Sequence, residues 1–403
     1  MRRHCSSIGL LIIATLTALL AACGRAPVDP NEIRIGFVFD KTGPLEAYMK
    51  QTQVGFQMGL DYATEGTFTV AGKKLRVIER DSKGKPDVAK AQLAAAYADD
   101  KVALAIGAGG SGVSLAMLPV AEDYRRLLII EPAVADTITG AKWNRYVFRT
   151  ARNSSQDAIA NAKVHDHAGT SIATLAQDNA FGRDGIRAFK AALQKAQLVH
   201  EEFLPPSTND FTAGAQRIID ALKDRPGRKI VFVAWAGATS PFKIADLNLA
   251  RYGIEIATGG NILPAMAAYK AFPGMEGATY YYYGIPRNPI NDELVRRHQA
   301  QFNGPPDFFT AGGFAAAMAV VTALKKTNGD ARTETLIASM RGMSFDTPKG
   351  VMRFREEDHQ AMQAMYHMRI KNDPNLPWAV PELVREITPE EMNVPIRNQN
   401  IQR

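Results

Sequence analysis

The sequence predicts an α/β protein with two lobes, each a parallel sheet covered by helices. Short apolar stretches alternate with helical patterns and short loops, and such alternation is typical of parallel sheets covered on both faces. The alternation restarts after residues 149–153, and a chain of 403 residues is too long for one ordinary core. Hydrophobic and charged contents of 46% and 22% are typical of globular proteins.

The first unit is expected to alternate four strands with three helices. Asp87 is expected to cap the second helix, because an aspartate before an alanine-rich helical pattern can accept its free N–H groups. The predicted strands are 33–39, 75–81, an apolar run beginning at Val102, and 127–130, and the predicted helices are 45–64, 88–99 and 113–124.

The second unit repeats the alternation, and a helical region follows it. The predicted strands are 171–176, 198–203, 229–234, 255–258 and the aromatic run 280–283, with helices at 154–167, 183–196, 211–223 and 240–251. Further helices are expected at 291–303, 308–326 and 333–341, then a hairpin that pairs 349–355 with 365–371. Residues 373–403 are proline-rich and polar, which predicts a loosely ordered C-terminal tail.

The N-terminus has the pattern of an export signal. Basic residues precede an apolar run over 8–20, which is too short for a comfortable membrane span. The sequence Leu-Ala-Ala-Cys at 20–23 resembles a bacterial lipobox. We therefore expect a lipoprotein signal peptide at 1–22, lipidation of Cys23, and a tether over 23–31. The alternative is an ordinary signal peptide cut near Ala22.

Charge and cysteine content exclude several classes of function. The net charge of +7 is modest, and no basic block with interleaved aromatic residues suggests nucleic-acid binding. Cys5 and Cys23 are the only cysteines, so the body of the protein has neither disulfides nor thiolate metal sites. The expected location is the periplasm, with the protein held to a membrane by its lipid.

A glycine-rich turn follows the apolar run that begins at Val102. The pattern predicts a strand, a tight turn and a helix N-terminus, whose free N–H groups and dipole favour an anion. The favoured interpretation is that Gly110 and Ser111 bind a ligand carboxylate or a similar polar group. One alternative is a purely structural turn. The other is a dinucleotide site, because Gly107, Gly109 and Gly112 spell G-x-G-x-x-G.

The dinucleotide alternative would make the protein a nicotinamide-dependent oxidoreductase. Glu131 lies nineteen positions past Gly112, where such a site places an acid. However, the turn is not on the first strand of its unit, and an exported protein has little access to nicotinamide cofactors. No cofactor and no catalytic residue is therefore predicted, and Ser111 lacks the spacing of a nucleophile elbow.

An ordered set of short motifs resembles the leucine/isoleucine/valine-type solute-binding proteins. The resemblance spans roughly residues 32–372, and it depends on the order of the motifs more than on any one of them. The motifs are Ile35-Gly36, Thr42-Gly43-Pro44-Leu45 with Tyr48, Gly55 with Gly59, Gly110-Ser111, Pro132-Ala133, Phe181-Gly182, and the strand over 229–241 with Gly237 and Pro241.

The resemblance implies a type I periplasmic-binding-protein fold, in which two lobes close on a small ligand in the cleft between them. It places three hinge crossovers near 149–154, 282–286 and 343–349. The first lobe would then comprise 32–152 plus 285–345, and the second 153–284 plus 346–372.

The resemblance also places a set of residues along the cleft: Tyr48, Gly110, Ser111, Ala133, Val134, Ala135 and Phe181. Two positions depart from relatives that bind α-amino acids. Ala135 stands where such relatives often have a hydroxyl residue, and Asn261 stands where an acid commonly meets the ammonium group. Asn261 has no formal charge, so a ligand without a tightly read ammonium group is favoured.

Aromatic residues of the second unit are further candidates. Trp235 and Tyr283 could line an apolar pocket, although ordinary core packing is the alternative for both. His165-Asp166-His167 could suggest a metal site, but a helix end also favours histidine, and no metal is predicted. Asp40 and Asp178 are interpreted as turn formers or caps.

Together these features predict a lipid-anchored, monomeric solute-binding protein. It would capture a small amino acid, amide or organic acid and deliver it to the membrane permease of an ABC importer. The mechanism would be hinged closure, in which the ligand shifts the population from open to closed lobes. A ligand sensor of the same fold, which signals to a partner, is the main alternative.

Overall fold

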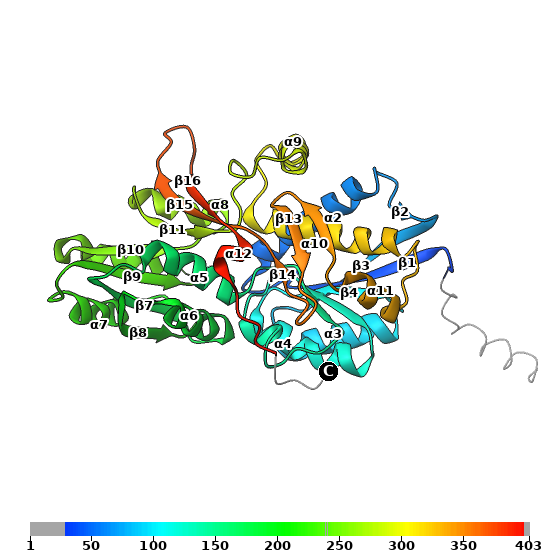
Figure 1. The fold of residues 1–403 in the computed structure, drawn as a ribbon, viewed down its shortest axis with the longest axis horizontal. Coiled ribbons are helices and arrows are strands. Elements are labelled where there is room, and N and C mark those ends of the chain that lie inside the picture. Colours follow the sequence, from blue (N-terminus) through cyan, green and yellow to red (C-terminus); the bar gives the residue numbers. More distant parts are fainter. Residues whose placement is uncertain (1–28, 238, 240, 399–403) are drawn as a thin grey trace, which may run out of the picture.

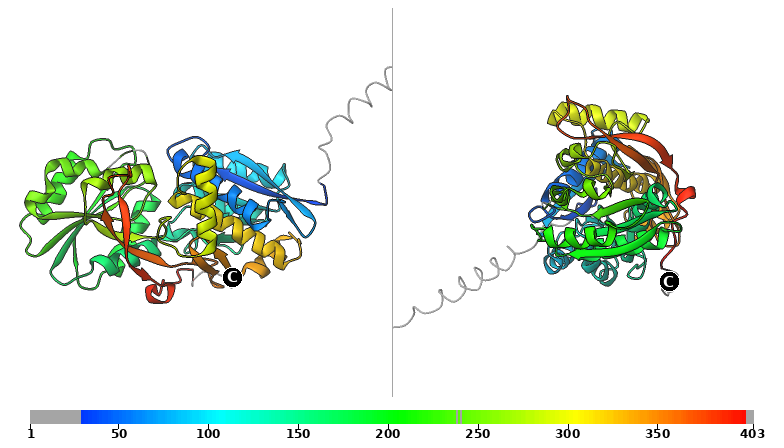
Figure 2. Two further views of the ribbon diagram at one scale, coloured as in Figure 1. Left: turned by 90° about the horizontal axis from the view of Figure 1, so that it is seen from above. Right: turned by 90° about the vertical axis from the view of Figure 1, so that its left-hand side faces the viewer.

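A computed structural model describes residues 29–237, 239 and 241–398 of the chain. The predicted signal peptide, Cys23 and most of the tether lie outside these residues. The described chain forms two α/β lobes that lie side by side (Figure 1), and views at right angles show the same division (Figure 2). The predicted fold class is confirmed.

The first lobe is built on a six-stranded sheet in the order β2-β3-β1-β4-β5-β6. All neighbouring strands pair in parallel except the short β2, which is antiparallel to β3. The strands are β1 (Glu32–Phe39), β2 (Thr69–Val70), β3 (Lys73–Asp81), β4 (Leu104–Gly107), β5 (Leu127–Ile130) and β6 (Val147–Arg149). β4 and β5 are buried throughout, as expected for central strands covered on both faces.

Helices α2 (Glu46–Ala63), α3 (Pro86–Ala98) and α4 (Ser111–Asp123) connect these strands. The predicted cap at Asp87 is wrong. Helix α3 begins one residue earlier, at Pro86, and Asp87 lies in its first turn without a capping hydrogen bond. Proline at the first helical position has a φ angle already suited to a helix and lacks an N–H, so it starts the helix without a side-chain cap.

The first lobe also contains α9 (Pro289–Phe302), α10 (Phe308–Lys326) and α11 (Thr333–Met340). Among the described helices, α10 alone is long and apolar enough to cross a bilayer, but it is largely buried against the first lobe. It crosses α2 so closely that three glycines form the contact. A Cβ at Gly55 would lie 1.9 Å from the carbonyl oxygen of Thr310, and Gly59 and Gly313 are similarly confined.

The second lobe is built on a parallel sheet in the order β10-β9-β7-β8. These strands are β7 (Thr170–Gln177), β8 (Gln197–Leu204), β9 (Arg228–Ala234) and β10 (Ile254–Thr258). Helix α5 (Ser154–His165) precedes β7, and α6 (Ala180–Ala192) and α7 (Thr212–Leu222) connect β7 to β8 and β8 to β9. The predicted helix 240–251 is wrong. In its place are the 3₁₀ segments η3 (Pro241–Leu247) and η4 (Leu249–Tyr252), separated where Asn248 adopts a left-handed φ of 54°.

The predicted strand 280–283 is also wrong. The strand there is β11 (Glu276–Thr279), and the tyrosines follow it into a crossing between the lobes. The hydroxyl of Tyr280 donates to the carbonyl oxygen of Phe308 at 2.8 Å, and that of Tyr281 donates to Oδ1 of Asn291 at 2.8 Å. These buried rings therefore hold the crossing to the first lobe instead of extending a sheet.

The predicted hairpin of 349–355 with 365–371 does not form. Strand β13 (Gly350–Phe354) pairs with β12 (Ser344–Thr347) and β14 (Ala361–Met362), whereas β15 (Met365–Lys371) pairs with β11. Phe354 and Ala361 are buried in the core of the first lobe. That lobe therefore extends beyond the expected boundary at 345, and the third crossing lies between β14 and β15 rather than near 343–349.

Residues 380–398 form a strand, a short helix and a segment packed on the first lobe, contrary to the predicted loose tail. Strand β16 (Val380–Ile387) pairs antiparallel with β15 at the edge of the three-stranded sheet β11-β15-β16. Its exposed residues are the charged Glu382, Arg385 and Glu386 together with Leu383 and Val384. Charged residues are common on an edge strand that faces solvent, and here they resembled disorder in the sequence. The short helix α12 (Pro389–Met392) follows it.

Residues 388–398, which we call the return segment, run from β16 back to the first lobe. The guanidinium of Arg397 pairs with Asp136 at 3.2 Å, and the side-chain amide of Asn398 donates to the carbonyl oxygen of Glu357 at 2.6 Å. The carbonyl oxygen of Val394 accepts from Arg355 at 2.6 Å. The lobes are thus connected four times, by three crossings and this segment (Figure 1).

Arg149 ends β6 beside the first crossing and is 0% exposed. Its Nε donates to Oε1 of Gln360 at 2.6 Å, one terminal nitrogen donates to the carbonyl oxygen of Ala135 at 2.7 Å, and the other donates to the hydroxyl of Thr139. Burial lowers the pKa of this guanidinium to about 10, and the nearby Asp136 opposes that change. Arg149 therefore joins three segments at the base of the hinge.

Candidate functional site

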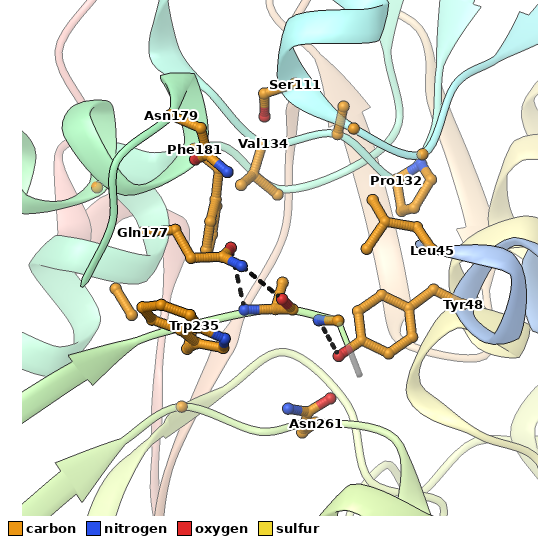
Figure 3. Close-up of a pocket in the computed structure, with 18 of the residues that line it drawn as sticks. Leu45, Tyr48, Ser111, Pro132, Val134, Gln177, Asn179, Phe181, Trp235 and Asn261 are labelled. Carbon is orange, nitrogen blue, oxygen red and sulfur yellow. Dashed lines mark hydrogen bonds between the residues drawn. The ribbon is translucent and has the colours of Figure 1, made fainter. Parts of the chain in front are cut away.

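A cavity of about 630 Å³ lies between the two lobes. It is lined by the loops that follow β1, β3, β4 and β5 in the first lobe and β7, β8, β9 and β10 in the second. Ligands of open α/β sheets bind at this edge, beyond the carboxyl ends of the strands. Side chains from both lobes point toward a common space (Figure 3), and most of its lining is apolar.

Eight of the ten predicted ligand-binding residues line this cavity, and the other two do not. Ala135 is fully buried behind the wall, and Tyr283 packs against Tyr282 at the second crossing with ring centroids 4.5 Å apart. The expectation that these two would line the cleft is therefore wrong. The residues that do line it are Tyr48, Gly110, Ser111, Ala133, Val134, Phe181, Trp235 and Asn261.

The glycine-rich turn forms the wall of the first lobe. Helix α4 begins at Ser111 with Gly110 as its N-cap residue, so the first N–H groups of the helix have no acceptor within it. The Ser111 hydroxyl oxygen accepts from the N–H of Ala135 at 3.1 Å. That bond holds the oxygen in place and leaves the hydroxyl proton for another acceptor. The wall thus presents several donors, as an anion or carbonyl group requires.

Tyr48 connects the two walls directly. Its ring stacks on Phe309 with centroids 4.7 Å apart, and its hydroxyl oxygen accepts from the N–H of Gly237 at 3.0 Å. Tyr48 belongs to α2 in the first lobe and Gly237 follows β9 in the second, so this hydrogen bond spans the cleft (Figure 3). It depends on the two lobes being close together.

The wall of the second lobe is aromatic and amide-rich. Trp235 packs edge-to-face on Phe211 with centroids 5.0 Å apart, and its indole N–H donates to Thr239 at 2.9 Å. The side-chain amide of Gln177 donates to the carbonyl oxygen of Ala236 at 2.8 Å and so fixes the loop after β9. The Asn261 side-chain oxygen accepts from the N–H of the next residue at 2.8 Å, and its amide also interacts with the hydroxyls of Tyr48 and Tyr269.

The end of the cavity nearest the hinge contains residues that the sequence did not indicate. Arg152 and Asp157 line it together with Phe308 and Phe309, which begin α10. Arg152 Nε donates to Oδ1 of Asp157 at 3.0 Å. Burial raises the pKa of Asp157, and the charge of Arg152 opposes that change.

The remaining candidates from the sequence have local roles in the structure. Asp40 lines the cavity but is 1% exposed, its Oδ1 accepts from Ser82 at 2.6 Å, and burial raises its pKa. Asp178 pairs with Arg183 at 2.8 Å. Asp166, from the possible metal motif, accepts from the backbone N–H groups of residues 194–196, and the described residues contain no cluster of three potential metal ligands.

Glu131 does not reach the cavity. It is 1% exposed and accepts from the hydroxyl of Thr150 at 2.9 Å. A Cβ at Gly109 would lie 3.0 Å from a carboxylate oxygen of Asp40, so this glycine serves close packing inside the turn. The acid that a dinucleotide site would use to hold a ribose is therefore buried elsewhere.

Two α/β lobes that share a cavity across a hinge are typical of periplasmic solute-binding proteins. The comparisons agree with that class: residues 32–375 match the family model of periplasmic binding proteins, and the chain belongs to this family. The Leu/Ile/Val-binding protein homolog 3 of Brucella melitensis is 22% identical over 86% of this chain and 93% of its own length.

Two solved structures from Rhodopseudomonas palustris are also similar. One, described as an ABC-type branched-chain amino acid transporter, is 61% identical over 91% of this chain and all of the other, with a TM-score of 0.82. The second, a solute-binding protein in complex with 3,4-dihydroxybenzoic acid, is 26% identical over 89% of this chain and 98% of its own, with a TM-score of 0.76. The predicted family is confirmed.

Proposed function

We propose that the protein captures a small amino acid, amide or organic acid in the interlobe cavity and delivers it to the permease of an ABC importer. The observation that carries this proposal is the pairing of donors at Gly110 and Ser111 with an aromatic wall on the opposite lobe. The ligand carboxylate or carbonyl would bind the donors, and its apolar body would lie against Trp235 and Phe181. Binding involves no chemical step.

The lobes would close on the ligand by bending at the three crossings and the return segment. Tyr48 supports this mechanism, because its hydrogen bond to Gly237 joins the lobes at the cavity itself. A ligand that contacts both walls binds the closed form more tightly than the open form. The ratio of these two affinities sets how far the ligand shifts the equilibrium toward closure. The relatives support both an amino acid and an aromatic acid as the bound solute.

A ligand screen tests this proposal. Calorimetry on protein lacking residues 1–23 is expected to detect binding of at least one small carboxylate or amide. Ser111→Ala should weaken that binding roughly 10- to 100-fold, because one hydrogen bond to a charged or carbonyl oxygen is lost. Ser344→Ala, at an exposed position in β12, is the control and should leave the affinity unchanged. Unchanged affinity in the Ser111 variant would refute the assignment of Ser111 as a binding residue for the ligand carboxylate or carbonyl group.

The proposal also includes attachment to a membrane of the cell envelope through Cys23, with the protein acting as a monomer in the periplasm. The lipobox-like sequence at 20–23 supports the anchor. Cys23→Ser is expected to move the protein from the membrane fraction to the soluble periplasmic fraction. Fractionation of cells expressing each form, followed by blotting, measures this shift, and a variant that stays with the membrane would contradict lipid anchoring.

A further inference from the structure

We infer that Asp157, positioned by Arg152, accepts a hydrogen bond from a donor group on the ligand. The ligand therefore carries an amine or hydroxyl group in addition to its carboxylate or carbonyl group. This inference rests on the proposed function, because it concerns the same cavity. Asp157, on α5, would then act as the acid of the cavity. Asn261 stands where an acid commonly meets the ammonium group in relatives that bind α-amino acids, and it has no charge.

The geometry of the pair leaves Asp157 able to bind a ligand. The ion pair is not bidentate, because a single hydrogen bond joins Nε of Arg152 to Oδ1 of Asp157, at 3.0 Å. In the described part of the chain, Oδ2 of Asp157 has no hydrogen-bond partner. The Asp157 side chain is 29% exposed, and both residues line the cavity. One carboxylate oxygen is therefore free to accept.

Arg152 is held in place and cannot follow a ligand readily. Its guanidinium lies over the ring of Tyr280, 4.6 Å from the centroid, and over the ring of Phe308, 5.0 Å from the centroid. Its side chain is 11% exposed. The helix that carries Asp157 is also fixed at its start, because Asn153 and Gln156 form a capping box. Arg152 is thus a positioning residue for the acid.

The neighbouring polar side chains of the same lobe are already engaged. The Asn161 amide donates to the carbonyl oxygen of Asp157 at 2.8 Å and its oxygen accepts from Ala278 at 2.9 Å. The hydroxyl of Thr258 donates to the carbonyl oxygen of Val233 at 3.0 Å, and that of Thr279 donates to a carbonyl oxygen at 3.1 Å. Oδ2 of Asp157 is the charged acceptor that remains at this end.

The charges in the cavity select what Asp157 can meet. Among the described lining residues, the charged ones are Asp40, Arg152 and Asp157. A second carboxylate beside Asp157 would be repelled, whereas an ammonium, amine or hydroxyl group satisfies its free oxygen. The ligand carboxylate therefore belongs at Ser111 and the donor at Asp157. The loop that contains Val134 and Ala135 connects the two positions. The N–H of Ala135 donates to Ser111, and the carbonyl oxygen of Val134 accepts from Ser154, which lies on the same helix as Asp157.

Matched ligand pairs test the inference by calorimetry on protein lacking residues 1–23. The pairs differ by one donor group: leucine against 4-methylpentanoate, and 4-hydroxybenzoate against benzoate. In the pair that binds, the natural protein is expected to prefer the donor-bearing member at least tenfold. Asp157→Asn should reduce that preference to threefold or less, while affinity for the other member changes little.

Asp178→Asn is the matched control, because Asp178 is an acid of the same lobe that does not line the cavity. It should keep the full preference. If Asp157→Asn does not fold, Asp157→Glu retains the charge but displaces it by one methylene, and the preference should fall at least threefold. A preference that survives in the folded Asp157 variant, or is absent from the natural protein, would overturn the inference. Failure of every carboxylate and amide to bind would instead overturn the proposed function.

Discussion

Gly55→Ala is expected to destabilise the protein by about 3 kcal/mol, because α2 and α10 touch at this position. The added Cβ would lie 1.9 Å from the carbonyl oxygen of Thr310 and 2.6 Å from its carbonyl carbon. Neither atom belongs to a flexible side chain, so one helix must shift away from the other. The loss should appear as a lower denaturant midpoint measured by circular dichroism.

Gly185→Ala is the matched control for this substitution. Gly185 also lies inside a helix, α6, but a Cβ there would meet no atom within 4 Å. Its replacement should leave stability unchanged or raise it by up to about 1 kcal/mol, because alanine favours helices over glycine. Equal effects of the two substitutions would show that helix propensity, and not the contact of α2 with α10, determines the result at Gly55.

Arg149→Met is expected to cost about 3–5 kcal/mol of stability, because three buried hydrogen bonds are lost at once. Methionine has a similar length but donates no hydrogen bond, so the bonds to Gln360, Thr139 and the carbonyl oxygen of Ala135 are all lost. Each such bond contributes about 1–1.5 kcal/mol. Because these groups lie at the first crossing, the variant should also bind ligand more weakly. Urea unfolding and calorimetry measure the two effects.

Arg332→Met provides the comparison at an exposed site. Arg332 pairs with Asp330, but its side chain is 81% exposed, and ion pairs in solvent contribute little to stability. A small loss of stability at Arg332 and a large loss at Arg149 would show that the destabilisation comes from the burial of Arg149. If Arg149→Met were as mild as Arg332→Met, the hinge would not depend on this network.

Local patterns predicted the elements whose residues determine their own structure. The strand at 127–130 and the helix at 308–326 were predicted at their observed bounds, because an apolar run and a long apolar helix are evident without knowledge of the fold. The pairing of strands could not be predicted in this way. The segments that became β13 and β15 were recognised as strands, but they belong to different lobes, and no local pattern specifies which distant strand each one meets.

Within the site, the predicted residues were those carried by short motifs, such as Ser111 and Phe181. Arg152 and Asp157 were missed because each is ordinary in sequence, near the start of a helix where charged residues are common. Their importance comes from the rings of Tyr280 and Phe308, more than a hundred positions away. Tyr283 was overestimated for the opposite reason, because an aromatic run attracts notice whether or not it faces a cavity.

The return segment determines where the motion of the lobes could be observed. Because it joins the first lobe at Arg397 and Asn398, it brings the end of the described chain onto the same body as β1, its first strand. Fluorophores attached near these two ends would keep a constant separation as the lobes move, and energy transfer between them would not change. A useful sensor needs one dye on the second lobe, for example in the exposed loop 224–227 between α7 and β9.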